Sequence, residues 1–410
     1  MSGSTPTSFV PRLAAALAGA CLCVAAAAAP AKAYVGNFKD DTVSVIDTAA
    51  GAVVATIAVA KGPHGMAIGR GGSPVYVSGD GATVVSVIDA ASDKVAGAIE
   101  VGRSPHGLAL APDGRTLLVG VYGEDRVAFV DTASHAVVAT APIAKPHTIA
   151  IRPDGKLAYV ASQQPGAFAL VVIDLATRSV VRTLPLDKAP RDLEFGWDGK
   201  ALYFTMAGID AVQVLDAASD AIVASIPTGP SPHVAMQARG AAAGTVVVQG
   251  PGELMLFDPA TRKPLRSISV GKQPHWMAPA DAGKTFYVTN EGSNDVSVID
   301  LASGTTKTIG VGNAPRKVVV QQGEVTSAAN VSIANFAFAP AEARIEPGAA
   351  LTWSNDDGSP HAIAFADGAP PSDLLLPGAR FSRRFDQPGT YEYVCSVHPY
   401  MSGRVVVRAR

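Results

Sequence analysis

The sequence predicts an all-β protein whose larger part is a seven-bladed β-propeller, and three observations support this prediction. Hydrophobic segments that end in aspartate recur seven times, at intervals of 42 or 43 residues. Each repeat holds four short runs of strand-forming residues, and turn signals such as Pro-Asp-Gly separate the first run from the second. Four strands in a period of about 40 residues are typical of one propeller blade. The repeated aspartates, interpreted as turn-forming caps, are Asp47, Asp89, Asp131, Asp174, Asp216, Asp258 and Asp300.

The repeats cover residues 34–321, and both ends of this region fall inside a blade. The chain enters at Tyr34 on a second strand, and the last unit supplies only a first strand, Lys317 to Gln321. We therefore expect the two ends to complete one blade together, which closes the ring and removes its free edges. Tyr34-Val-Gly-Asn37 and Tyr287-Val-Thr-Asn290 resemble the motif of the YVTN-repeat seven-bladed propellers.

A second repeated position lies just before the innermost strand of each blade. A proline there is followed by histidine in five blades and by arginine in two. Ring symmetry would gather these side chains at one mouth of the central channel. Three interpretations stay open: a second metal site, a site for an anion or substrate, or simply the way this repeat starts an inner strand. The residues are His64, His106, His147, Arg191, His233, His275 and Arg316.

The C-terminal segment carries the pattern Cys395-Ser-Val-His398-Pro-Tyr-Met401, with His361 upstream in a Ser-Pro-His turn. Two histidines and a cysteine form the trigonal plane of an electron-transfer copper site, and a distant methionine completes it. Zinc is the alternative, but zinc does not ordinarily recruit a thioether. The pattern therefore predicts one copper ion held by His361, Cys395, His398 and Met401.

Residues 330–410 resemble a small cupredoxin of the amicyanin or plastocyanin type, with Phe336 and Phe338 expected to point inward and Trp353 leading into the His361 turn. The resemblance implies a β-sandwich with one type 1 blue copper centre that transfers single electrons. Pro399 and Tyr400 beside His398 predict a partly exposed ligand edge. A redox partner, such as a soluble cytochrome or another copper protein, would exchange electrons there.

A propeller followed by a cupredoxin also resembles the layout of nitrous oxide reductase. Two departures weaken that resemblance: Pro399 stands where a second cysteine would be expected, and Arg191 and Arg316 replace two ring histidines. The resemblance implies a head-to-tail homodimer in which the copper of one subunit meets the ring of another. Three functions stay open: an electron carrier with the propeller as docking or substrate-binding platform, a two-centre copper-dependent oxidoreductase, and a non-catalytic module that senses or sequesters copper.

Residues 1–33 are expected to be a secretory signal peptide. Arg12 precedes an apolar run from Leu13 to Ala29, and the small-residue pattern Ala31-Lys32-Ala33 predicts cleavage after Ala33 and a periplasmic location. A lipid anchor at Cys21 is disfavoured by its poor sequence context. Cleavage would leave Cys395 as the single cysteine and change the net charge from −2 to −4. No clustered basic excess predicts nucleic-acid binding, and no other long apolar run predicts stable membrane insertion. Residues 322–329 are expected to be a linker.

Overall fold

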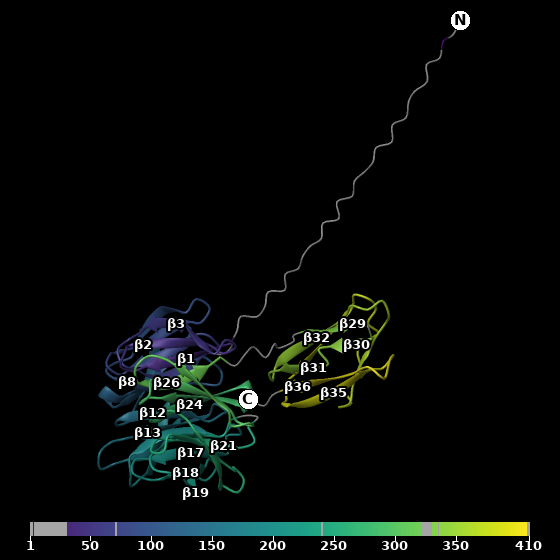
Figure 1. Cartoon of the computed structure of the whole chain (residues 1–410). Coiled ribbons are helices and arrows are strands. Elements are labelled where there is room, and N and C mark those ends of the chain that lie inside the picture. Colours follow the sequence, from purple (N-terminus) through teal and green to yellow (C-terminus); the bar gives the residue numbers. More distant parts are fainter. Residues whose placement is uncertain are drawn as a thin grey trace.

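The structure, a computed structural model, describes residues 3, 31–69, 72–238, 241–321, 330–334 and 336–407. Most of the expected signal peptide, with Arg12 and Cys21, lies outside the described residues, as does the expected linker 322–329. Figure 1 shows two bodies built of strands, the larger one formed by the repeats and the smaller one by the C-terminal segment. The all-β fold class is thereby confirmed. Within the described ranges, no helix has the length and apolarity that crossing a bilayer requires.

The larger body consists of seven four-stranded antiparallel sheets, one for each blade. Second and third strands are mostly buried, because each sheet packs against the sheets of its neighbours. Outer strands expose many of their side chains to solvent. The inner strands are β4 (Pro63–Ile68), β8 (Pro105–Leu110), β12 (Pro146–Ile151), β16 (Pro190–Phe195), β20 (Pro232–Met236), β24 (Pro274–Ala280) and β28 (Pro315–Val320). The second strands are β1 (Lys32–Asn37), β5 (Val75–Gly79), β9 (Thr116–Val121), β13 (Leu157–Ser162), β17 (Ala201–Met206), β21 (Gly244–Val248) and β25 (Thr285–Asn290).

The third strands are β2 (Thr42–Asp47), β6 (Val84–Asp89), β10 (Arg126–Asp131), β14 (Ala169–Asp174), β18 (Ala211–Asp216), β22 (Glu253–Phe257) and β26 (Asp295–Asp300). The outer strands are β3 (Ala52–Ala58), β7 (Lys94–Glu100), β11 (Ala136–Pro142), β15 (Ser179–Pro185), β19 (Ala221–Pro227), β23 (Pro264–Ser269) and β27 (Thr306–Gly310). Two 3-10 turns, η2 (Tyr122–Glu124) and η3 (Asp281–Gly283), interrupt the described connections. The turns after the third strands behave as predicted: the Asp47 carboxylate accepts the amides of Ala49 and Ala50 at 2.8 and 2.9 Å.

One blade joins the two ends of the propeller, as predicted. Its strand order is β28-β1-β2-β3, and β1 pairs antiparallel with β28, Tyr34 lying opposite Val319. β1 starts at Lys32, so cleavage after Ala33 would remove the first two residues of this strand. Because β28 and β1 supply each other's hydrogen bonds, the ring closes between segments almost 300 residues apart in sequence.

The inner strands of neighbouring blades approach so closely that glycine is required in two of them. A Cβ atom on Gly65 would lie 2.1 Å from the carbonyl oxygen of His106, and one on Gly107 would lie 2.4 Å from that of His147. Glycine directly after the Pro-His pair therefore lets one blade's backbone reach the next. The close approach also brings the ring residues of adjacent blades together.

The smaller body is a sandwich of two four-stranded sheets around one aromatic core. Trp353 lies fully buried at its centre and packs against Phe365, Phe381 and Tyr393. The first sheet contains β29 (Asn330–Ala334), β30 (Ala337–Ala339), β32 (Ala349–Asn355) and β34 (Arg380–Phe385). The second contains β31 (Glu342–Ile345), β33 (Ile363–Phe365), β35 (Gly389–Cys395) and β36 (Ser402–Val407).

The expectation that Phe336 points inward is wrong, whereas Phe338 is buried as expected. Phe336 is 41% exposed and has a φ of 55° in the turn between β29 and β30. This left-handed backbone turns its side chain out of the sandwich core. The ring then lies 5.7 Å from the imidazole of His361 and 5.0 Å from that of His398, measured between centroids.

Candidate metal centre

Cys395 is the last residue of β35, and its side chain is fully buried. The chain then folds back in a short loop before β36 begins. The amide of Cys395 donates to the carbonyl of Met401 at 3.0 Å, and the amide of His398 donates to the carbonyl of Cys395 at 3.2 Å. These local bonds hold three of the four predicted ligands in one loop, and Met401, 3% exposed, shares a core cluster with Cys395.

His361 comes to the same place from a separate loop. It forms an isolated bridge with Leu375, and the amide of each donates to the carbonyl of the other at 3.0 and 2.7 Å. The Nε2 atom of His361 lies 3.1 Å from Oδ2 of Asp357. A carboxylate accepts hydrogen bonds, so Nε2 carries the proton and Nδ1 presents its lone pair to Cys395. The same Asp357 oxygen accepts the amide of Phe336 at 2.9 Å.

The three donor atoms form a nearly equilateral triangle. Cys395 Sγ lies 3.5 Å from Nδ1 of His361 and 3.7 Å from Nδ1 of His398, and the two nitrogens are 3.3 Å apart. Among the described residues, this is the one group of three or more His, Cys, Asp or Glu side chains whose donor atoms all lie within 4.8 Å of one another. Two of its members, His361 and Cys395, are completely buried.

The triangle has the size of a transition-metal site, and its chemistry fits copper. With the bond lengths that zinc makes, about 2.0 Å to nitrogen and about 2.3 Å to sulfur, an ion at its centre would set the donor separations at about 3.5 to 3.8 Å. The observed separations are close to these values. Two imidazoles and a thiolate with a nearby thioether are typical of copper electron-transfer sites.

An apolar rim surrounds the His398 edge of the triangle. Tyr400 is 72% exposed, and its ring centroid lies 6.1 Å from that of His398. Phe336 meets the same imidazole edge-on, at an interplanar angle of 89°. Val397, 44% exposed, lies next to His398 in the chain. Tyr400 lies at the ligand edge predicted from the sequence, whereas Phe336 was expected in the core and Asp357, four residues before His361, was not anticipated.

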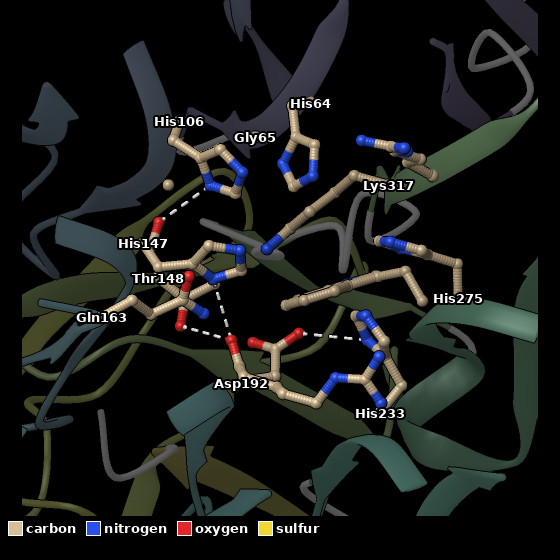
Figure 2. Close-up of a pocket in the computed structure, with 14 residues that line it drawn as sticks. His64, Gly65, His106, His147, Thr148, Gln163, Asp192, His233, His275 and Lys317 are labelled. Atoms are coloured by element: carbon tan, nitrogen blue, oxygen red, sulfur yellow. Dashed lines mark hydrogen bonds and ion pairs between the residues drawn. The ribbon is translucent and has the colours of Figure 1, made fainter. Parts of the chain in front are cut away.

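The seven ring residues predicted at the propeller mouth line a single cavity of about 230 Å³ (Figure 2). Their imidazoles pack against one another in tilted pairs. Ring centroids are 3.7 Å apart for His64 and His106, and 4.1 Å apart for His106 and His147 and for His233 and His275. The structure thus brings the predicted residues together, and the inner strands place one of them in each blade.

The imidazoles of this cavity are held in their neutral form. His106 Nδ1 lies 3.0 Å from the carbonyl of His147, and His147 Nδ1 lies 2.9 Å from that of Arg191, so both Nδ1 atoms carry protons. Burial lowers the pKa of His106 to about 4 and that of His275 to about 3, and neighbouring cationic groups contribute to the lowering. These histidines are therefore uncharged at neutral pH.

The cavity wall also contains residues that were not predicted from the sequence, among them Asp192, Trp276 and Lys317. Each directly follows one of the ring residues Arg191, His275 and Arg316, so the available signal was the next position of the repeat. The Nζ atom of Lys317 lies 3.2 Å from the centroid of the Trp276 ring. Figure 2 shows Lys317 reaching into the hollow between the imidazoles.

Two family models match different parts of the chain. A model of copper binding proteins, the plastocyanin/azurin family, matches residues 325–408. A YNCE-like beta-propeller model matches residues 16–113. The predicted recognition of a propeller followed by a cupredoxin is thereby confirmed.

Curated relatives match the C-terminal body. Amicyanin-alpha of Methylorubrum extorquens is 39% identical over 82 residues, which are 19% of this chain and 69% of the relative. Amicyanin of Paracoccus denitrificans is 33% identical over 82 residues, covering 19% of this chain and 63% of the relative. Plastocyanin of Scenedesmus fuscus is 34% identical over 84 residues, covering 17% of this chain and 86% of the relative.

Solved structures also resemble the chain over most of its length. Hydrazine synthase of Kuenenia stuttgartiensis matches with a TM-score of 0.61 at 21% identity, over 66% of this chain and 92% of the other. A functionally unknown protein of Desulfotomaculum acetoxidans matches with a TM-score of 0.60 at 14% identity, over 72% of this chain and 99% of the other. At these identities the likeness indicates the fold alone.

Proposed function

We propose that the protein is an exported carrier of single electrons, because the chain belongs through its C-terminal domain to the plastocyanin/azurin family of copper-binding proteins. The observation that supports this most directly is the buried triangle of His361, Cys395 and His398. Met401 would be the fourth, more distant ligand. We further propose that the seven-bladed propeller, residues 34–321, is a platform on which a partner or substrate docks.

When bound, copper supplies a one-electron redox couple. The chain's own residues hold the donor atoms in place: Asp357 fixes the tautomer and orientation of His361, and the hydrogen bonds of the Cys395–Met401 loop hold the rest. The buried positions of Cys395 and His361 keep water from the centre. A donor set arranged before electron transfer limits the rearrangement that accompanies each change of charge.

The metal content and spectra of the mature protein test this proposal. We expect one copper per chain, an intense visible absorption from the copper–thiolate bond, and the EPR signal of a single Cu(II) centre. A protein that takes up no copper, or that binds copper without visible thiolate absorption, would contradict the assignment. A second metal per chain would favour a two-centre copper oxidoreductase with its other centre at the propeller cavity.

Electron exchange with a partner is expected to pass the apolar rim around His398. Replacing Tyr400 with Glu should slow exchange with a soluble cytochrome or a second copper protein about tenfold or more. A charge in the apolar contact would be desolvated without a partner, which costs binding free energy. The measurement is stopped-flow electron transfer, together with the visible spectrum, which should change little because Tyr400 is not a proposed ligand.

Thr390→Glu is the matched control for this variant. It adds the same charge at the exposed start of β35, five residues from Cys395 and therefore about 17 Å along the strand. The control should exchange electrons at nearly the normal rate in buffer of moderate ionic strength. Equal slowing by both substitutions would show that net charge, not the rim, governs the exchange.

Two further parts of the proposal depend on the sequence. The signal-peptide pattern of residues 1–33 supports export to the periplasm, and the layout of the two domains supports a head-to-tail homodimer.

The five histidines in one cavity favour a second candidate function, a two-centre enzyme. We prefer the electron carrier because, among the described residues, no three donor atoms of that ring come within 4.8 Å of one another.

A further inference from the structure

We propose that the cavity at the propeller mouth binds a small oxyanion, a carboxylate or inorganic oxyanion of a few heavy atoms, through Arg191, Arg316 and Lys317. The site is separate from the copper centre and does not depend on the proposed electron transfer. Its volume of about 230 Å³ is several times the roughly 30 Å³ that one water occupies in the liquid, so a small anion fits with some of its hydration.

Three cationic side chains line the cavity, and a neighbouring side chain orients each of them. Arg191 Nη1 donates to Ser231 Oγ at 2.9 Å, which uses one of the guanidinium's five N–H donors. The Arg316 guanidinium lies 3.6 Å from the centroid of the Phe38 ring. Lys317 lies over Trp276. Side chains held in this way lose little conformational entropy when an anion binds.

Among the lining residues of the cavity, three cationic side chains face one carboxyl group. Asp192 is the one carboxylate among the cavity's lining residues, and burial raises its pKa well above the usual value. Nearby, burial also raises the pKa of Glu194 and of Asp80. Glu291, 3.2 Å from Arg316, is the carboxylate that pairs with a cation of the wall. Burial lowers the pKa of Lys317, while Glu194 and Asp192 act to raise it.

Two buried polar atoms of the wall have no close hydrogen-bond partner. They are Oδ2 of Asp192 and Nδ1 of His233, two of the seven such side-chain atoms in the described part of the chain. Buried polar atoms without a close partner require an explanation, and a small bound group that rearranges this pair is one. Asp192 Oδ2 and His233 Nδ1 are 3.6 Å apart, so a modest rearrangement on binding can satisfy both.

A cation is the competing occupant, and the charges argue against it. A metal ion in this cavity would lie among two guanidiniums and an ammonium. The two occupants also differ in their linkage to protons. An anion stabilises protonated imidazoles, so its binding takes up protons and strengthens as pH falls toward the lowered pKa values of His106 and His275. A metal ion needs neutral imidazoles and binds more tightly as pH rises.

Calorimetric titration of the copper-loaded mature protein tests the proposal, with sulfate at pH 4.5 and pH 7.5 and acetate at pH 7.5 as probes in dilute buffer. We expect saturable binding of one anion per chain, tighter for sulfate at pH 4.5, which is close to the lowered pKa of His106, and a change in Trp276 fluorescence on binding. Tighter binding of sulfate would indicate an inorganic oxyanion, and tighter binding of acetate a carboxylate. Zinc and copper are titrated in parallel.

Arg191→Gln and Lys317→Met should each weaken anion binding about 10- to 100-fold, since each removes a hydrogen bond to a charged group. The matched control is Lys94→Gln, on the exposed outer strand β7, which removes the same charge away from the cavity and should bind normally. Thermal unfolding shows whether each variant is folded.

Three outcomes would overturn the proposal, and the first two need no variant. The first is that no saturable anion binding occurs at millimolar concentrations, and the second is that the protein takes up a second metal ion more tightly at the higher pH. The third is that Lys94→Gln weakens anion binding as much as the two cavity variants do. That third outcome would mean that the bound anion is an adventitious ion only.

Discussion

A Cys395→Ser variant is expected to lose the visible absorption of the copper centre completely and to bind copper far more weakly. The thiolate is the softest donor of the set, and a serine hydroxyl keeps its proton at neutral pH. The loss of affinity should exceed the about 10- to 100-fold change typical when a residue that only supports a metal ligand is removed. Absorption spectroscopy and copper content after dialysis measure both effects.

Ser396→Ala is the matched control for Cys395→Ser. The two positions are adjacent in the same loop, but Cys395 is fully buried and Ser396 is exposed. The control should keep both colour and copper. If Cys395→Ser retained the visible absorption, the assignment of Cys395 as a copper ligand would be wrong. If it lost the absorption only because the domain unfolded, its thermal transition would reveal that.

Replacing Trp353 with Ala should lower the free energy of unfolding of the C-terminal domain by about 3 to 5 kcal/mol. The indole is fully buried, and its centroid lies 5.6 Å from that of Phe365 and 5.2 Å from that of Tyr393. Alanine would leave a cavity that these rings cannot fill without leaving their own positions. Such a loss is a large part of the stability of a small domain.

Denaturant unfolding, followed by visible absorption for the C-terminal domain and by far-ultraviolet circular dichroism for the whole chain, measures this effect. The aromatic core around Trp353 contains no propeller residue, so the propeller transition should stay in place. Trp197→Ala is the matched control, because Trp197 is 42% exposed on the propeller. Its effect on the C-terminal transition should be negligible. A shift of both transitions by Trp353→Ala would show that the two domains unfold together.

Much of the fold could be predicted because its signals are local and repeated. A period of 42 or 43 residues with four strand-like runs defines a blade, and seven copies define the ring. The closing blade followed from where the repeats begin and end, and the pairing of β1 with β28 confirms it. Cys395, His398 and Met401 were recognisable together because a loop of a few residues leaves little freedom in how they meet.

The convergence of the seven ring residues was also predictable, since ring symmetry alone places equivalent positions around one channel. Their charge environment was not. Lys317 of β28 and Asp192 of β16 share the cavity although their inner strands belong to blades three apart in the ring, because both side chains point into the central channel. That placement depends on how seven blades close, which no single repeat encodes.

The sequence by itself therefore determined the periodic fold, the loop that carries three of the predicted copper ligands, and the residue types at the propeller mouth. Only the tertiary structure decided how side chains from distant segments face each other. It turned Phe336 out over His398, placed Asp357 behind His361, and set Lys317 among the imidazoles. The physical reason is that a side chain's direction follows its own backbone dihedrals and its packing partners, and both are settled only when the sheets assemble.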